Sequence, residues 1–176
     1  MRQSQISRIT DLTEKLPFWD KLSKEERAYI NSVSFLRRFE KDGFIHGSGN
    51  DCLGMLLVIS GEIRTYLLSE EGREITLFRI YPNDICVLSA SCVISQITFD
   101  TFMTAKQETE VLIVHANAVA LLKERNINIK CFLYEENDTV KTTIGAVNSL
   151  ENITLDEFLQ NVEFSIENYS RVCKDY

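Results

Sequence analysis

The middle of the chain is built from short apolar runs separated by turn residues, and this pattern constrains the fold more than any other feature. Between Phe35 and His115 the runs are FLRRFE, GFIH, GMLLVIS, EIRTYLLS, REITLFRIY, ICVLSASCVI, TFMTA and EVLIVH. Short β-type runs with turn signals about every 8 to 12 residues are typical of an antiparallel sandwich or barrel. We therefore predict a mainly β fold for this region.

A hairpin between residues 62 and 81 is the clearest part of the pattern. Its turn runs from Ser69 to Gly72, and the glycine takes the positive φ that such turns need without steric cost. Apolar and polar residues roughly alternate in its strands, which predicts one buried and one solvated face. The apolar set is Ile63, Tyr66, Leu68, Ile75, Leu77 and Phe78.

Helical patterns precede the β region, so residues 1–34 are predicted as N-terminal helices. Ser23 and Glu26 form a capping box, which indicates a helix from Ser23 to Val33. An earlier helix is indicated by apolar residues that recur on one helical face. These residues are Ile6, Ile9, Leu12 and Leu16.

Helical patterns also follow the β region. The run NAVALLKERN predicts a short helix that closes a β domain over residues 35–132, and residues 133–176 read as a helical C-terminal segment. In that segment a seam with alternating spacings of four and three residues is typical of a coiled coil, so we predict a homodimer. The alternative is a helix that packs on its own β domain with Asn137 exposed. The seam residues are Leu133, Asn137, Val140, Ile144 and Val147.

The composition is that of an ordinary packed globule with more acidic than basic residues. The 176 residues include 26 acidic and 19 basic side chains, a formal net charge of −7. Phosphate contacts need a basic surface, and the sequence has no basic stripe. No segment approaches the roughly 20 apolar residues of a membrane span, and no signal peptide is recognisable. We expect a cytoplasmic protein without a membrane partner.

The sequence carries no enzyme signature. It has no G-x-S-x-G elbow, no Walker loop and no dinucleotide fingerprint. His46 and His115 are the two histidines, too few and too far apart for the facial metal set of a jelly-roll oxygenase. We predict a protein without enzymatic activity or a metal site, with His46 in a solvated loop and His115 hydrogen-bonded at a strand end.

Four landmarks in the β region resemble the effector-sensing domain of the Crp/Fnr transcription regulators. They are the turn Ser60–Ile63, the hairpin Glu70–Glu74, the P-x-D at Pro82–Asp84, and the run TEVLIV before a helix. The resemblance covers roughly residues 16–132. It implies a double-stranded β-helix (jelly roll) of the cyclic-nucleotide-binding type followed by helices. It further implies a long dimer helix and a C-terminal winged helix-turn-helix that binds DNA.

The residues expected to bind a nucleotide differ from the family pattern. Nucleotide-binding members carry a Gly-Glu pair for the ribose and an Arg-Ser or Arg-Thr pair for the phosphate. Alignment on Thr104 places Leu88 and Ser89 at the first pair, and Phe99 and Asp100 at the second. A buried phosphate needs a guanidinium or several amides, and a carboxylate repels it. We therefore predict an unknown small-molecule effector other than a cyclic nucleotide.

The predicted effector pocket is mostly apolar with a few polar groups, which is the usual character of a small-ligand site. Arg79 and Lys106 are the nearest cations that could replace the missing arginine, which leaves an unconventional cyclic-nucleotide binder as one alternative. The predicted lining residues are Cys86, Leu88, Ser89, Cys92, Phe99, Asp100 and Phe102.

A second alternative is a thiol or iron–sulfur redox switch that uses Cys86 and Cys92, with Cys52 as a third ligand. The spacing of Cys86 and Cys92 matches no strong metal signature, and cysteine often serves as a small buried hydrophobe. The five cysteines are an odd number in a protein expected in a reducing compartment. We therefore expect free or ligating thiols and no cofactor.

We do not expect the DNA-reading module implied by the resemblance in this sequence, which reads either as a sensor without a DNA reader or as part of a full regulator. After Leu150 there is one helical pattern, and its cations are Arg171 and Lys174. We expect no DNA binding by this chain alone, and DNA binding only by a full-length regulator.

Overall fold

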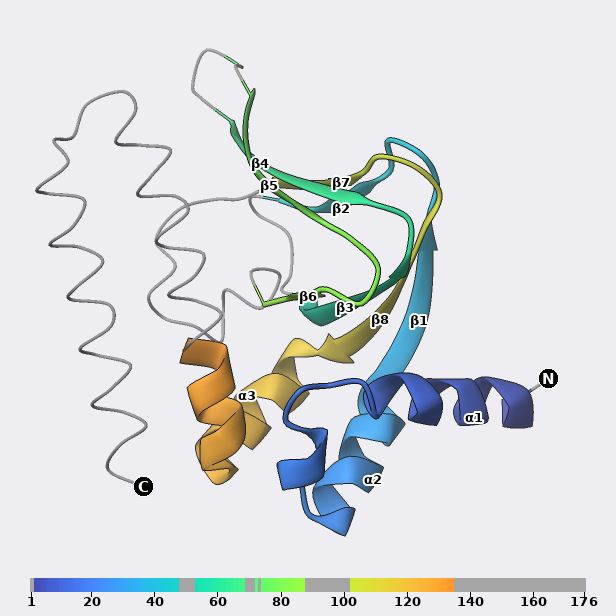
Figure 1. Cartoon of the computed structure of the whole chain (residues 1–176), viewed down its shortest axis with the longest axis vertical. Coiled ribbons are helices and arrows are strands. Elements are labelled where there is room, and N and C mark those ends of the chain that lie inside the picture. Colours follow the sequence, from blue (N-terminus) through green and yellow to red (C-terminus); the bar gives the residue numbers. More distant parts are fainter. Residues whose placement is uncertain (1, 48–52, 69–71, 73, 88–101, 135–176) are drawn as a thin grey trace, which may run out of the picture.

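The computed structural model describes residues 2–47, 53–68, 72, 74–87 and 102–134 (Figure 1). Its helices are α1 (Arg2–Thr13), the 3-10 turn η1 (Trp19–Lys21), α2 (Lys24–Val33) and α3 (Ala116–Arg125). Residues 127–134 are helical as well. The strands are β1 (Ser34–Phe39), β2 (Phe44–His46), β3 (Gly54–Ser60), β4 (Ile63–Leu68), β5 (Glu74–Ile80), β6 (Ile85–Cys86), β7 (Phe102–Ala105) and β8 (Thr109–His115).

The described strands form two antiparallel sheets of four strands, in the orders β1-β8-β3-β6 and β2-β7-β4-β5. The sheets face each other across an apolar interior (Figure 1). This arrangement confirms the predicted jelly roll. The interior cluster consists of Phe39, Ile45, Leu56, Val58, Ile63, Ile80, Cys86, Met103, Ala105, Val111 and Ile113.

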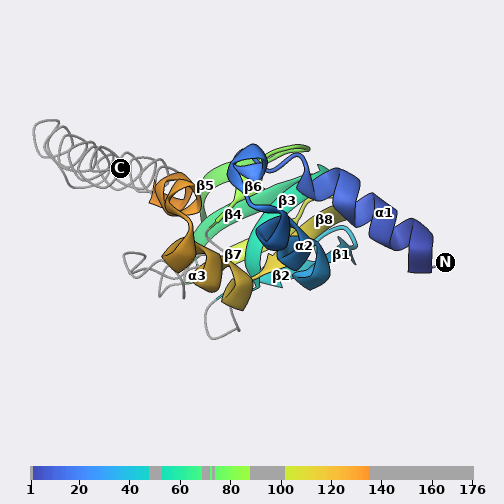
Figure 2. The same ribbon diagram turned by 90° about the horizontal axis from the view of Figure 1, so that it is seen from below.

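β8 lies between β1 and β3 in the first sheet and is buried on both faces, which explains its unbroken apolar run. Val111 and Ile113 belong to the interior cluster, while Leu112 and Val114 pack on the helical side. Successive side chains of a strand point to opposite faces, so a sheet covered on both sides needs apolar residues at every position. Figure 2 shows α1, α2 and α3 on the outer side of the roll.

The helical side has a core of its own, which joins the N-terminal helices to residues 127–134. Phe18 and Phe132 contact each other with ring centroids 5.1 Å apart. Leu133 is only 1% exposed and lies in this core within its own chain. Leu133 thus packs within its own chain, against the N-terminal helices and the first sheet. The other predicted dimer residues, Asn137, Val140, Ile144 and Val147, lie outside the described residues.

Local expectations for the helix caps and the hairpin are confirmed. Ser23 caps α2 by accepting a hydrogen bond from the Glu26 amide, and Glu26 accepts one from the Ser23 amide in return. Gly72 has a φ of 79° between β4 and β5. His115 ends β8 and caps α3, since its Nδ1 accepts a hydrogen bond from the Asn117 amide at 3.2 Å.

Four expectations are wrong. Ile6 is 64% exposed, because α1 contacts the first sheet through Leu12 and the partly buried Ile9. Leu68 is 46% exposed. His46 is buried, because an irregularity in the β2–β7 pairing between Phe44 and His46 lets neighbouring residues both face inward. Cys131 is disulfide-bonded, so its thiol is not free.

No helix in the described part of the chain is long and apolar enough to cross a membrane.

Candidate effector site

The described part of the candidate site lies at the ends of β6 and β7. β6 belongs to the first sheet and pairs with β3, whereas β7 lies between β2 and β4 in the second sheet. Among the described residues, β6 ends in the first sheet at Cys86 and β7 begins in the second sheet at Phe102. The predicted site residues Leu88, Ser89, Cys92, Phe99 and Asp100 lie outside the described residues, so their role stays a prediction.

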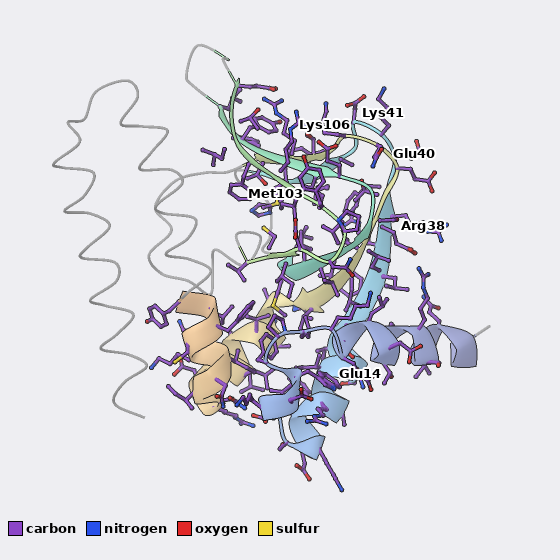
Figure 3. The ribbon with its side chains drawn as sticks, viewed as in Figure 1. Glu14, Arg38, Glu40, Lys41, Met103 and Lys106 are labelled. Atoms are coloured by element: carbon purple, nitrogen blue, oxygen red, sulfur yellow. The ribbon has the colours of Figure 1, made fainter. Side chains whose placement is uncertain are left out.

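Cys86 and Met103 line the interior from opposite sheets. Cys86 is 4% exposed and pairs in register with Leu56. Met103 is completely buried, and Figure 3 shows it between the two sheets. Both belong to the interior cluster. The end of the roll where β6 ends and β7 begins therefore presents apolar and sulfur-containing groups.

Phe102 lies on the other face of β7. It is opposite Tyr66 in register, and the two rings stack with centroids 5.7 Å apart and an interplanar angle of 26°. The Arg64 guanidinium lies 4.6 Å from the centre of the Tyr66 ring. A Cβ at Gly47 would come within 2.7 Å of the Phe102 ring, so only glycine allows this close approach. The structure does not bring Phe102 together with Cys86 in the interior cluster.

Thr65 is a site residue that the sequence analysis did not identify. It is completely buried on β4, two residues after the interior residue Ile63, so it faces the interior too. Its neighbours across the ladders are Met103 on β7 and Phe78 on β5. The Thr65 hydroxyl has no hydrogen-bond partner in the described part of the chain. Counting two residues on from Ile63 would have found it.

The buried polar residues of the described chain include no lysine and no arginine. They are Thr13, Ser34, His46, Thr65, Thr109 and Glu110. The two cations considered as replacements for the missing arginine are half-exposed and paired elsewhere. Arg79 donates to Glu62, and Lys106 lies 3.1 Å from Asp42. Lys106 also follows the end of β7 that is remote from Phe102 (Figure 3).

Glu110 is the buried carboxylate of this set, and it faces the helical side of the first sheet. Arg8 of α1 donates two hydrogen bonds to its oxygens, at 3.1 and 2.5 Å, and the Arg38 Nε donates one at 3.1 Å. The hydrogen bonds from Arg8, and then the one from Arg38, hold the pKa of Glu110 below its ordinary value, against the opposing effect of burial. This carboxylate therefore fixes α1 to β8 and is remote from the interior.

The comparison with solved structures decides the family. A protein from Eubacterium rectale ATCC 33656, assigned as a transcriptional regulator of the Crp/Fnr family, superimposes with a TM-score of 0.73 and 32% identity. The match covers 88% of this chain and 74% of that one. This chain belongs to the Crp/Fnr family. The described residues correspond to the effector domain of such regulators.

More distant structures share the fold of this Crp/Fnr-family chain. The sensor domain of the regulator DNR from Pseudomonas aeruginosa matches with a TM-score of 0.64 and 16% identity, over 85% of this chain and 98% of that one. The regulatory domain of protein kinase A from Toxoplasma gondii, solved with cAMP, matches with a TM-score of 0.61 and 13% identity, over 78% and 51%. Searches against family models and against curated proteins found no match.

In this Crp/Fnr-family chain, Asn126 forms the junction between α3 and the next helix. Its backbone amide donates to the Leu122 carbonyl at 2.8 Å and ends α3. Its side-chain oxygen accepts from the Asn128 amide at 3.0 Å and begins the next helix. Its side-chain nitrogen lies 3.1 and 3.2 Å from the two Glu26 carboxylate oxygens. One residue thus links α2, α3 and residues 127–134.

The described residues contain no group of three or more His, Cys, Asp or Glu side chains that could hold a metal ion. Cys86 is the one predicted redox residue among them, and it is buried. Cys52 and Cys92 lie outside the described residues.

Proposed function

We propose that this chain senses a small effector other than a cyclic nucleotide and passes the signal through the helix that begins at residue 127 to a second copy of the chain. The coarser statement, a sensor domain of a Crp/Fnr-like regulator, rests on the Eubacterium rectale relative and on the shared fold. A role in DNA binding is proposed only at the level of the family, from the Crp/Fnr relative.

The observation that carries the proposal is the charge of the interior. A phosphodiester taken out of water needs a cation and several hydrogen-bond donors, since an uncompensated buried charge is very costly. Among the described residues no arginine or lysine is buried, and the half-exposed Arg79 and Lys106 are paired with carboxylates. The described interior suits a ligand with little or no charge.

The proposed route for the signal is the shared core on the helical side. Phe132 and Leu133 of the helix that begins at residue 127 pack with Phe18 and with Val87, which directly follows β6. An effector that favours one of two packings of this core shifts the balance between them. The dimer seam is proposed for Asn137, Val140, Ile144 and Val147, which follow this helix in the sequence and lie outside the described residues.

The test is the identity of what the folded protein binds. Mass spectrometry of the small molecules released on denaturing the purified protein is expected to find a molecule of low charge in a stoichiometric amount. Calorimetric titration with cAMP and with cGMP is expected to give no saturable heat. Saturable heat with either nucleotide would overturn the proposal in favour of an unconventional nucleotide binder.

The same preparation tests the redox alternative. A reactive thiol needs thiolate character and access to solvent, and Cys86 is 4% exposed. In anaerobically purified protein the Cys86 thiol is therefore expected to stay unmodified after brief peroxide treatment, as read by peptide mass spectrometry. A brown colour with bound iron would support the iron–sulfur switch instead.

A further inference from the structure

Thr65 stands out among the buried polar groups because it is completely buried and its hydroxyl has no partner in the described chain. A buried hydroxyl without a hydrogen bond destabilises a protein, and such groups are rare in folded structures. Valine has the same shape without this penalty. We propose that the Thr65 hydroxyl hydrogen-bonds to the effector and sets its specificity, an inference that rests on the proposed function.

The position of Thr65 fits this role. Its cross-strand neighbour Met103 directly follows Phe102, where the chain enters the second sheet, and its other neighbour is Phe78. From the first sheet, Cys86 lines the same interior cluster just before the chain leaves that sheet. Thr65 therefore lies on the interior wall at the end of the roll where the effector is expected.

The surroundings also define the chemical class of the ligand. A hydroxyl can donate one hydrogen bond and accept others, so it suits a carbonyl or hydroxyl group equally. Met103, Phe78 and Cys86 offer apolar and polarisable contacts but no charge. The ligand is a neutral molecule with an apolar body and one carbonyl or hydroxyl group directed at Thr65.

The first measurement is the thermal stability of Thr65→Val in dialysed protein without added probe. Because the substitution removes an unpartnered buried hydroxyl and keeps the shape, the melting temperature is expected to rise by about 2 to 4 °C. Thr65→Ser keeps the hydroxyl, so its melting temperature is not expected to rise. A fall in the melting temperature of Thr65→Val would show that the hydroxyl is satisfied within the protein, which would overturn the inference.

The second measurement compares two probes of similar shape, 4-methylphenol and toluene, by calorimetric titration. The phenol is expected to bind the unmodified protein about 5-fold more tightly, because it alone can hydrogen-bond to Thr65. This preference is expected to disappear in Thr65→Val and to persist in Thr65→Ser. The control Thr104→Val makes the same change on β7, at a partly exposed position on the opposite face, and is expected to keep the preference.

The outcomes separate this inference from the proposed function. Equal binding of both probes, no binding of either, or a preference that survives in Thr65→Val would overturn the role of Thr65 and leave the sensor proposal standing. Saturable heat with cAMP would overturn the proposed function, whatever the two probes do.

Discussion

Two threonines show how differently the two sides of the first sheet treat polar groups. Thr13, at the end of α1, and Thr65, in the roll interior, are both completely buried. The Thr13 hydroxyl lies 2.9 Å from the Thr10 carbonyl and 2.6 Å from the Asn31 amide oxygen. The Thr65 hydroxyl has no partner in the described chain. On the helical side the buried hydroxyl of Thr13 fixes α1 to its neighbours. In the interior the hydroxyl of Thr65 is proposed to bind the effector.

The largest expected effect concerns the core of the helical side. Leu133→Ala removes a side chain that is 1% exposed and leaves a cavity, so we expect a loss of about 2 to 5 kcal/mol in the free energy of unfolding. Because Leu133 packs within its own chain, the loss measured by urea denaturation is expected to be independent of protein concentration. Leu121→Ala, at a position that is 37% exposed on α3, is the matched control with a small effect. A loss that appears only at high protein concentration would place Leu133 in the dimer seam.

The next effect tests the contrast between the two threonines directly. Thr13→Val leaves the Asn31 amide without its partner, so we expect a loss of about 1 to 3 kcal/mol in the free energy of unfolding, measured by urea denaturation. Thr65→Val is expected instead to raise the free energy of unfolding. Equal losses in the free energy of unfolding for Thr13→Val and Thr65→Val would mean that the helical side and the interior satisfy their hydroxyls alike.

The Asn126 junction gives a smaller effect of the same kind. Asn126→Asp keeps the oxygen that caps the next helix but places a second carboxylate against Glu26. We expect a loss of about 1 to 2 kcal/mol in the free energy of unfolding from the repulsion and the lost hydrogen bonds. Adding Glu26→Gln is expected to restore much of the loss, because the amide can donate to Asp at this position. Additive losses in this double-mutant cycle would show that the two residues are not coupled.

These contrasts also show which parts of the structure the sequence could predict. Local signals sufficed where the chemistry is local, as in the capping box of Ser23 and the glycine turn at Gly72. The strand pattern predicted the two sheets, because alternation and turn residues depend on neighbours along the chain. The Crp/Fnr resemblance was confirmed by the Eubacterium rectale relative.

The misses have a common cause, which is packing between distant segments. Heptad spacing at Leu133 predicts an apolar face but not its partner, and the partner at that position is the chain's own core. His46 is buried by an irregularity in strand pairing that no periodicity reveals. The β4–β5 pairing is irregular after Thr65, since Thr65 lies opposite Phe78 while Tyr66 lies opposite Thr76, and alternation along one strand does not predict this shift.

The smallest effect is the pH dependence that Glu110 confers on the helical side. Because Arg8 and Arg38 lower its pKa in the folded protein, the carboxylate stabilises the fold at pH values above its unfolded pKa. This contribution is lost as the pH falls through the lower folded pKa, where Glu110 becomes protonated. Glu110→Gln is therefore expected to be less stable than the unmodified protein by about 1 kcal/mol at pH 7, with the difference shrinking in acid.

Urea denaturation of both proteins between pH 7 and pH 3 measures this difference, and added salt is expected to reduce it at pH 7, because Arg8 and Arg38 are partly exposed. Thr65→Val has no titrating group, so its change in stability is expected to be the same at every pH. A Glu110→Gln difference that stays constant down to pH 3 would mean that the arginines contribute packing alone. The two sides of the sheet would then differ in hydrogen bonding but not in charge.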